Sequence, residues 1–584
     1  DLHLSIRRQR QMCISDRKYS VQLNSILGFS QTLLHQLQLL DAFSSLRDIR
    51  FMKFSHKYII IGAGSAGCVL ANKLSNNPNN SVLLIEAGPM DNYSSIKMPL
   101  AASSLFKNKK YGWGYETEPE KNLNNRTINW PRGKTLGGSS SINGMLYIRG
   151  QAEDYEEWEK AGNSGWGYRD LMKYFVALEN NQNHEDQYHG NFGPLWVETY
   201  QPILEASKSF LNACKEYGLK KNNDFNGENQ EGYGQYQVNI KNGQRFSASD
   251  AFLKPILDRP NLELLTNTLV EKIITSNKKA VGVKIKNKKG TQIIGSTSEI
   301  VLCGGSINSP QLLMLSGIGP MKHLMDLKIP LVHDLPGVGK NLQDHLTVNV
   351  SYKINQLKTF SELMTPLGMI KNLFEYFTQR KGLMTYPASD IGIFFKTNIK
   401  IKTPNAQVHF APGAGKYNKN GAMKPSSGIT ASVCNLRPQS LGHLELISSN
   451  PEDAPKIFAN YLDQKVDMKF MIEGIQKIRE IFKTPSMQEL EAVEIEPGTH
   501  CINNNDMEEF IRNESLSVYH PVGTCKMGHG KECVVDDKLR VKGIKRLRVA
   551  DASIFPSIIS GNTNATCNVI GAKCADLILQ NTTA

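Results

Sequence analysis

The 584-residue sequence contains no hydrophobic run that approaches the roughly 18 consecutive apolar residues of a membrane-spanning helix. Its 10 cysteines include no Cys-x-x-Cys pair and no zinc-like spacing, so we expect no structural metal. No internal repeat or low-complexity tract occurs. These absences argue against an integral membrane protein, a zinc-dependent fold and a solenoid.

The charge of the chain is unbalanced but dispersed. There are 68 Lys and Arg residues against 55 Asp and Glu, which gives a net charge of +13. The lysines often lie beside asparagines, as in 108–110 and 277–279, and they form no basic stripe with interleaved aromatics. We therefore expect no nucleic-acid partner. Hydrophobic residues at 40%, charged residues at 21% and 47 glycines predict an enzyme-sized globular chain with a large core.

A strand, turn, helix and strand pattern begins at Lys57. Residues 58–61 and 81–85 are short apolar runs, and helix-forming residues lie between them at 68–74. Glu86 ends the second run, nineteen residues after the last glycine of the turn. The turn reads Gly62-Ala63-Gly64-Ser65-Ala66-Gly67.

This pattern predicts a dinucleotide site. The glycines would let the backbone approach a pyrophosphate, and the helix N-terminus would present unpaired N–H groups to it. The Glu86 carboxylate could accept hydrogen bonds from both hydroxyls of an adenosine ribose. The alternative is a tight turn without a ligand, and the pattern alone does not separate NAD from FAD.

Further glycine-rich and histidine-containing motifs narrow the choice. They are Arg132 to Met145, Gly305 to Gly319, Gly337 to Leu342 followed by Asp344-His345, Tyr519 to Thr524, Asp551 to Ser553, and Ser560 to Thr563. With these motifs, residues 55–580 resemble the glucose–methanol–choline (GMC) oxidoreductases, a family of FAD-dependent enzymes that oxidise alcohols. The sequence around His520 and Asn562 is similar to that of the insect-type glucose dehydrogenase and ecdysone oxidase branch.

The resemblance implies an α/β (mixed α+β) fold. A Rossmann-like FAD-binding domain would be assembled from discontinuous segments, and an antiparallel sheet with helices would form the substrate domain. The residues themselves predict antiparallel strands over 262–303, with a turn at 287–290, and a helix from Asp467 to Phe482. The expected divisions are an N-terminal arm at 1–53, the FAD-binding region at 54–349, the substrate domain at 350–514 and a completing segment at 515–584. Only the resemblance favours an extracellular location.

The resemblance also implies the residues that bind FAD. Asn143 and Gly144 would lie at the flavin ring, the Val270 backbone at the adenine, and Asp551 beside the diphosphate and ribityl chain. The alternative for Asp551 is a helix cap. The full set is Gly62, Gly64, Ser65, Ala66, Gly67, Glu86, Ala87, Arg132, Thr135, Leu136, Gly137, Gly138, Ser139, Asn143, Gly144, Met145, Leu146, Val270, Asp551, Ala552, Asn562 and Thr563.

Alcohol oxidation needs a group that takes the hydroxyl proton while hydride leaves carbon for flavin N5. Histidine suits this task because its usual pKa of about 6.5 keeps neutral imidazole available near neutral pH. The resemblance assigns the base to His520, and it places Asn562 where an amide would orient the substrate oxygen. The remaining histidines, including His345, His443 and His500, are expected to be structural.

The expected function is therefore oxidation of a small-molecule alcohol such as a sugar, a steroid or another alcohol, with a quinone-like compound or oxygen as the electron acceptor. Two alternatives stay open. Flavin-binding hydroxynitrile lyases share the fold and keep FAD without net redox, and a non-catalytic flavin-binding member is conceivable.

FAD is expected to be bound without a covalent link. Some choline-oxidising relatives tether the flavin through a histidine directly before the asparagine of this motif, and that position is Ile142 here. Because isoleucine has no nucleophilic atom, acid precipitation of the purified protein should release yellow flavin into the supernatant. Yellow colour that stays in the protein pellet would contradict the prediction.

Overall fold

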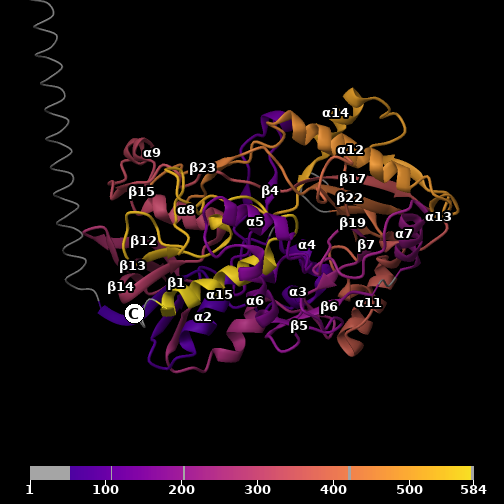
Figure 1. Ribbon diagram of the computed structural model, residues 1–584. Helices are drawn as coiled ribbons and strands as arrows, with labels where there is room; N and C mark the ends of the chain where they lie inside the picture. Colours follow the sequence, from indigo (N-terminus) through magenta and orange to yellow (C-terminus); the bar gives the residue numbers. More distant parts are fainter. Residues whose placement is uncertain (1–52, 107, 202–203, 418–422, 581–584) are drawn as a thin grey trace, which may run out of the picture.

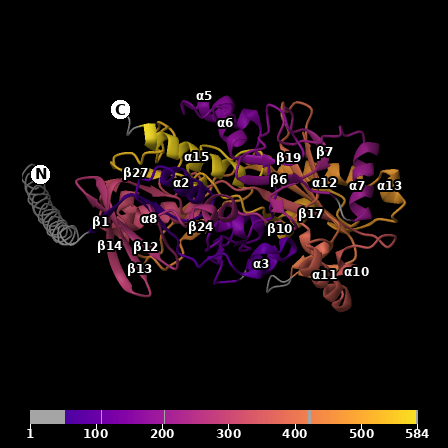
Figure 2. The same cartoon turned by 90° about the horizontal axis from the view of Figure 1, so that it is seen from below.

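A computed structural model describes residues 53–106, 108–201, 204–417 and 423–580. The expected N-terminal arm, apart from Lys53, lies outside the described residues. Figures 1 and 2 show an elongated body with one sheet toward each end and helices and loops between and around them.

The first sheet has seven strands in the order β11-β2-β1-β14-β13-β12, and β27 pairs with β14. The strands that pair in parallel are β1 (Lys53–Ile61), β2 (Val82–Ile85), β11 (Leu262–Leu265), β27 (Leu547–Val549) and part of β14 (Gly290–Leu302). Every residue of β2 is buried, as expected of a parallel strand covered on both faces. Because β27 comes from the far end of the chain, this Rossmann-type sheet is assembled from discontinuous segments.

The expected antiparallel hairpins are present. β12 (Leu269–Ser276), β13 (Lys279–Asn287) and β14 pair antiparallel, with the turn where the sequence predicted it. β11 differs, because it pairs in parallel with β2. The alternating pattern at 262–303 therefore predicted strands correctly but not the direction of the first one, since a strand reached by a long connection can join a sheet in either direction.

Three helices begin beside the carboxyl ends of the parallel strands. α2 (Ser65–Ser75) follows β1, α8 (Gly305–Leu315) follows β14, and α15 (Asn564–Gln580) follows the segment after β27. α2 and α15 lie side by side (Figure 1), and a Cβ added to Gly571 would lie 2.3 Å from the Ala66 carbonyl oxygen. This close packing directs both helix N-termini toward the same crevice, the usual ligand site of such sheets.

The second sheet is antiparallel. Its order is β25-β17-β22-β19-β18-β7, and β26 pairs with β17. The strands are β7 (Gly232–Gln235), β17 (Leu346–Lys353), β18 (Ile391–Phe395), β19 (Ala406–Ala411), β22 (Ile429–Asn435), β25 (Val493–Glu496) and β26 (Leu516–Ser517). Two of these strands, β7 and β17, begin before residue 350.

The two faces of this sheet differ. On one face, Val433 contacts α12 (Lys465–Ile481) at Gly474, and Phe410 stacks on Phe210 of α7 (Glu205–Glu216) at 4.0 Å. The alternate residues of the same strands are polar and face the other way. α12 confirms the helix predicted at 467–482, with a start two residues earlier.

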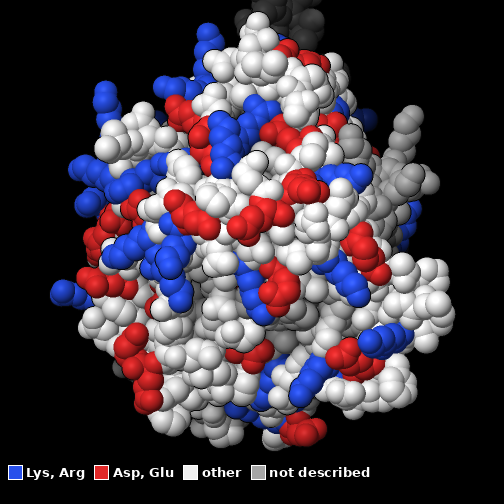
Figure 3. All heavy atoms as spheres, turned by 90° about the vertical axis from the view of Figure 1, so that its right-hand side faces the viewer, with Lys and Arg blue, Asp and Glu red and all other residues white. Residues whose placement is uncertain are grey.

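The described residues contain no helix that is both long and apolar enough to cross a membrane. On the face drawn in Figure 3, Lys and Arg side chains are interspersed with Asp and Glu side chains. The cysteines described here, including Cys501, Cys525 and Cys533, are free thiols.

Candidate active site

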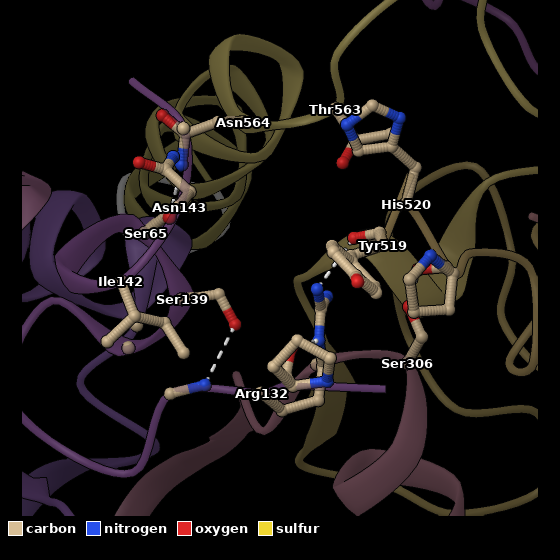
Figure 4. Close-up of a pocket in the computed structure, with 18 of the residues that line it drawn as sticks. Ser65, Arg132, Ser139, Ile142, Asn143, Ser306, Tyr519, His520, Thr563 and Asn564 are labelled. Carbon is tan, nitrogen blue, oxygen red and sulfur yellow. Dashed lines mark hydrogen bonds between the residues drawn. The ribbon is translucent and has the colours of Figure 1, made fainter. Parts of the chain in front are cut away.

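A cavity of about 580 Å³ lies between the two sheets. The carboxyl ends of the parallel strands, the segment from Pro131 to Leu146, the C-terminal segment and the polar face of the second sheet all contribute to its wall. Figure 4 shows side chains from the first three of these segments around one space.

Beside the N-terminus of α2, backbone segments of the cavity wall approach one another so closely that only glycine fits. Gly62 has φ +102°, and a Cβ there would lie 2.4 Å from the Cys303 carbonyl oxygen. A Cβ on Gly138 would lie 2.7 Å from the Cα of Gly64. Without side chains at these positions, the backbone at the N-terminus of α2 is accessible from the cavity. Such a surface fits a pyrophosphate.

Glu86 lies where a ribose is expected. It is buried, and its carboxylate accepts hydrogen bonds from the backbone N–H groups of Ala63 and Gly88, each at 2.9 Å. Burial raises the pKa of Glu86 to about 7, although these two N–H groups and Lys134 act in the opposite direction. Each carboxylate oxygen keeps a second lone pair that can accept a ribose hydroxyl.

Polar contacts between distant segments also hold the cavity wall in place. The Asn143 Oδ1 accepts from Met145 N at 3.1 Å and from Arg245 Nη1 at 2.7 Å. Asn564 Nδ2 donates to Ser65 Oγ at 2.7 Å, which ties the start of α15 to the start of α2 (Figure 4).

Asp551 is a cap, as the alternative from the sequence proposed, and it lies in the cavity wall. Its carboxylate accepts from the N–H groups of Ser553 and Gly305 at 2.8 and 2.9 Å and from the Ser309 hydroxyl at 2.6 Å. It therefore caps the turn η7 (Ala552–Ile554) and the start of α8, and it also lines the cavity.

Most of the residues assigned to FAD line this cavity. They are Gly62, Gly64, Ser65, Ala66, Glu86, Ala87, Arg132, Gly138, Ser139, Asn143, Gly144, Met145, Leu146, Val270, Asp551, Ala552, Asn562 and Thr563. Gly67, Thr135, Leu136 and Gly137 do not line it. The Thr135 hydroxyl donates to the Pro89 carbonyl at 2.8 Å, and Leu136 is fully buried, so these residues support the wall from behind.

The histidine expected to act as base is paired with a second histidine. His520 Nδ1 lies 3.0 Å from His345 Nδ1, and His345 Nε2 lies 3.2 Å from the Leu436 carbonyl oxygen. A carbonyl oxygen only accepts, so His345 carries its proton on Nε2 and accepts at Nδ1. His520 must then donate from Nδ1, which leaves its Nε2 unprotonated.

Both histidines are neutral. Burial lowers the pKa of His345 to about 3. Burial also holds the pKa of His520 well below its usual range, with smaller contributions from His345, His409 and Arg132. His520 therefore offers an unprotonated Nε2 at and below neutral pH.

Asn562 faces this nitrogen in a fixed orientation. Its Nδ2 lies 3.2 Å from His520 Nε2, and its Oδ1 accepts from Gln407 Nε2 at 3.2 Å. Gln407 Nε2 also donates to the Tyr236 hydroxyl at 3.0 Å, and that hydroxyl donates to the Val408 carbonyl at 2.8 Å. Because the tyrosine proton is already used, the Gln407 NH₂ group must point at Tyr236 and Asn562. The Asn562 NH₂ group is therefore directed at His520.

Asp344 fixes the backbone of the same histidine. Its carboxylate accepts from His520 N at 2.7 Å and from the hydroxyls of Tyr461 and Ser517. In the sequence, Asp344 and His345 are recognisable only as part of a family motif, and we expect His345 to be structural. Their adjacency to each other was visible, but their proximity to His520 arises from the folding of β17 against β26.

A row of polar side chains forms the opposite wall. His409, Ser432 and Asn349 are cross-strand neighbours on β19, β22 and β17, and all three line the cavity. Ser432 donates to Asn349 Oδ1 at 2.7 Å, and His409 Nε2 has no hydrogen-bond partner among the described residues. We did not predict this row from the sequence, although the alternation of polar and apolar residues in these strands indicates a polar face.

The only carboxylates among the described residues of the cavity wall are Glu86 and Asp551, which are both hydrogen-bonded in the Rossmann-type half. The wall around His520, Asn562 and the polar row therefore carries no carboxylate among the described residues; it holds neutral hydrogen-bonding groups, aromatic side chains and the Arg132 guanidinium, which donates to the Tyr519 carbonyl next to His520. This region suits an uncharged polar ligand.

A second titratable cluster lies elsewhere in the fold. His189 bonds through Nε2 to Asp224 at 2.9 Å and through Nδ1 to Glu179, which also pairs with Arg149. Burial lowers the pKa of His189, but the two carboxylates outweigh it and raise the pKa to about 9. Asp186 lies close to His189 and Asp224, but a protonated imidazole has no lone pair for a metal. His189 and Asp224 therefore belong to an ion-pair network with Glu179 and Arg149.

The fold and the cavity together define a dinucleotide-dependent oxidoreductase, in which a Rossmann-type site adjoins a His–Asn pair. Models of the GMC oxidoreductase family match residues 56–347 and 438–571, which together span most of the chain. The chain belongs to the GMC oxidoreductase family.

Characterised relatives agree with this assignment. The chain is 44% identical to an alcohol dehydrogenase [acceptor] of Pseudomonas putida over 532 residues, which cover 90% of this chain and 96% of the relative. It is 40% identical to an oxygen-dependent choline dehydrogenase of Vibrio vulnificus, over 90% of this chain and 95% of the relative.

Solved structures share the fold. Pyridoxine 4-oxidase from Mesorbium loti superposes with a TM-score of 0.82 at 28% identity, over 91% of this chain and all of that one. Formate oxidase from Aspergillus oryzae, whose FAD modification has been studied, gives a TM-score of 0.85 at 26% identity, over 91% of this chain and 99% of that one. The protein is a FAD-dependent enzyme that acts on CH–OH donors, with the mixed α/β fold that the sequence predicted.

The raised pKa of Glu86 predicts a pH-dependent affinity for FAD. Ribose hydroxyls donate to the ionised carboxylate, so FAD binding requires Glu86 to lose its proton, which costs free energy below pH 7. The dissociation constant of the apoprotein for FAD should be about tenfold higher at pH 6 than at pH 8, measured by fluorescence titration.

Glu86→Gln should bind FAD more weakly and with a flat profile over this range. Glu120→Gln serves as the matched control, because it alters a buried carboxyl with a pKa of about 6 outside the cavity wall and should keep the slope. An unchanged slope in Glu86→Gln would show that another group controls FAD binding.

Proposed function

We propose that this enzyme oxidises the CH–OH group of a small uncharged alcohol, with His520 as the base and Asn562 as the group that orients the substrate oxygen. One observation carries the proposal. Two hydrogen-bond chains start at the backbone carbonyls of Leu436 and Val408, and they end at two neighbouring groups of the cavity wall, His520 Nε2 and Asn562 Nδ2, which lie 3.2 Å apart.

These two groups are complementary to an alcohol. A hydroxyl that approaches both atoms from the cavity would donate its proton to His520 Nε2 and accept a hydrogen bond from Asn562 Nδ2, in place of their direct contact. Bound FAD supplies the acceptor, flavin N5, for the hydride that leaves the alcohol carbon. As the proton moves to His520, the amide of Asn562 stabilises the negative charge that develops on the oxygen.

The surrounding residues keep this pair ready. His345 stays neutral, and its Nδ1 accepts a hydrogen bond from the Nδ1–H of His520. This hydrogen bond prevents the tautomer of His520 that carries its proton on Nε2. Asp344 holds the backbone of His520, and Gln407 holds the amide of Asn562 in the donating orientation. Each therefore acts as a positioning residue, and proton transfer is assigned to His520 alone.

The absence of a carboxylate from this part of the described wall, together with the Arg132 guanidinium beside His520, favours an uncharged substrate over choline. A quaternary ammonium in this part of the cavity would meet no carboxylate from the described residues, and an unpaired buried cation is costly. The similarity to the Pseudomonas alcohol dehydrogenase supports simple alcohols. The resemblance of the C-terminal motifs to insect-type glucose dehydrogenases and ecdysone oxidases adds sugars and steroids as candidates. The acceptor is a quinone-like compound or oxygen.

Substitution of the pair tests the mechanism. His520→Ala should keep bound FAD but slow its reduction by the alcohol about 10²–10⁴-fold, because a positioned general base is lost. Asn562→Ala should slow it about 10²–10³-fold, comparable to the loss of one oxyanion donor. Stopped-flow absorbance, normalised to bound FAD, measures both effects.

His443→Ala is the matched control, since it removes an imidazole outside the cavity wall and should leave the rate near wild type. The low pKa of His520 also predicts that the acid limb of the wild-type reduction rate lies below pH 6.5. A wild-type rate in His520→Ala would overturn the assignment of the base.

Choline and its uncharged isostere, in which carbon replaces the ammonium nitrogen, test the substrate class. The two molecules have the same shape, so the difference in kcat/KM reports the charge. The isostere should be favoured by about 10²-fold or more, because no carboxylate compensates the cation. Equal values, or a preference for choline, would contradict an uncharged substrate, and parallel assays with oxygen and an artificial quinone identify the acceptor.

A further inference from the structure

One surface helix exposes apolar side chains where polar ones are usual. In α11 (Pro366–Gln379), Leu367, Ile370, Phe374 and Phe377 are 81%, 67%, 68% and 57% exposed. Their spacing of three, four and three residues places them on one face. We call these four residues the outer row.

The opposite face of α11 is apolar as well and is packed. Met369, Leu373 and Tyr376 contact a cluster that includes Met98 and Met384. The outer row is therefore not needed to attach the helix to the body. An exposed row of this kind marks a contact surface.

The helix lies at the rim of the active-site cavity. Leu100 contacts the cluster under α11 and also lines the cavity, as does Phe360 at the start of α10 (Phe360–Leu363), the helix that precedes α11. Figure 2 shows α10 and α11 projecting together from the edge of the body. Whatever covers the outer row therefore lies beside the cavity.

Cations flank the outer row. Lys371 is exposed on the same side of the helix, and Arg380 and Lys381 are exposed directly after its last turn. The Arg380 guanidinium lies 4.9 Å from the ring centroid of Tyr376, so it stays close to the helix. Apolar side chains bordered by cations match the boundary between acyl chains and anionic headgroups of a phospholipid layer.

We propose that α11 docks this enzyme on an anionic phospholipid bilayer, with the outer row inserted among the acyl chains and the three cations at the headgroups. A second copy of the chain is a poorer occupant. A helix of 14 residues is about 21 Å long and about 10 Å wide, so its face offers about 200 Å², a quarter of the roughly 800 Å² per partner in a stable interface. Binding to a bilayer has no such area requirement, because it needs only the immersion of the outer row.

Vesicle flotation of the holoenzyme tests the proposal. The vesicles contain phosphatidylglycerol and phosphatidylcholine in equal parts, or phosphatidylcholine alone. Wild type should float with the mixed vesicles and partition about tenfold or more weakly onto phosphatidylcholine alone. The double variant Ile370→Glu and Phe374→Glu should lose binding to the mixed vesicles by about tenfold or more.

The matched control is Phe192→Glu combined with Ile502→Glu, which introduces the same two charges at other exposed apolar positions. It should float like wild type. All three proteins should oxidise the best alcohol equally with a water-soluble acceptor, because the altered residues are outside the cavity wall.

Three results would overturn the proposal. They are absence of wild-type binding to mixed vesicles, undiminished binding of the Ile370 and Phe374 double variant, and equal loss of binding in the control. Sedimentation velocity without lipid supplies a further check, since a dimer that the double variant abolishes would identify a second copy as the occupant instead.

Discussion

The hydrogen bond between His345 and His520 joins the two halves of the molecule at the point where chemistry is expected. His345 directly precedes β17 of the second, antiparallel sheet, which we call the substrate sheet, and His520 belongs to the C-terminal segment that also supplies β27 to the first sheet. The direction of this hydrogen bond is set by the Leu436 carbonyl, which can only accept a hydrogen bond from His345 Nε2. A separate chain from the Val408 carbonyl reaches the facing amide of Asn562 through Tyr236 and Gln407. The protonation pattern of the site thus follows from the backbone of the substrate sheet.

The flavin half could be predicted well from the sequence because its constraints are local. Gly62 must be glycine since any Cβ would meet Cys303, and this need appears in the sequence as a motif of fixed spacing. The same holds for Glu86 at the end of β2. The motif overstated direct contact, however. Thr135 and Leu136 belong to the same segment as Ser139 but support the wall from behind, and a string of residues does not show which side of a loop faces a ligand.

The substrate half was less predictable because its constraints are tertiary. Asn349, Ser432 and His409 come from strands separated by many residues, and they meet only through the register of β17, β22 and β19. Alternation could indicate that each strand has a polar face, but that pattern usually means contact with solvent. Here the polar face covers a cavity, and the apolar face packs on α12 and α7. Gln407 carried no motif at all, since its role depends on the neighbouring tyrosine hydroxyl.

The late position of β27 has a consequence for biosynthesis. β14 is complete at Leu302 and β1 precedes it, but its second parallel neighbour, β27, begins only at Leu547, and α15, whose N-terminus faces the cavity, follows after that. During translation, the crevice therefore stays open on one side until the segment from Leu547 onward has emerged, and the contacts that close it are among the longest in sequence. Cofactor capture then coincides with the final step of folding, so a nascent chain gains the stabilisation of a bound dinucleotide only once its C-terminal segment has joined the sheet.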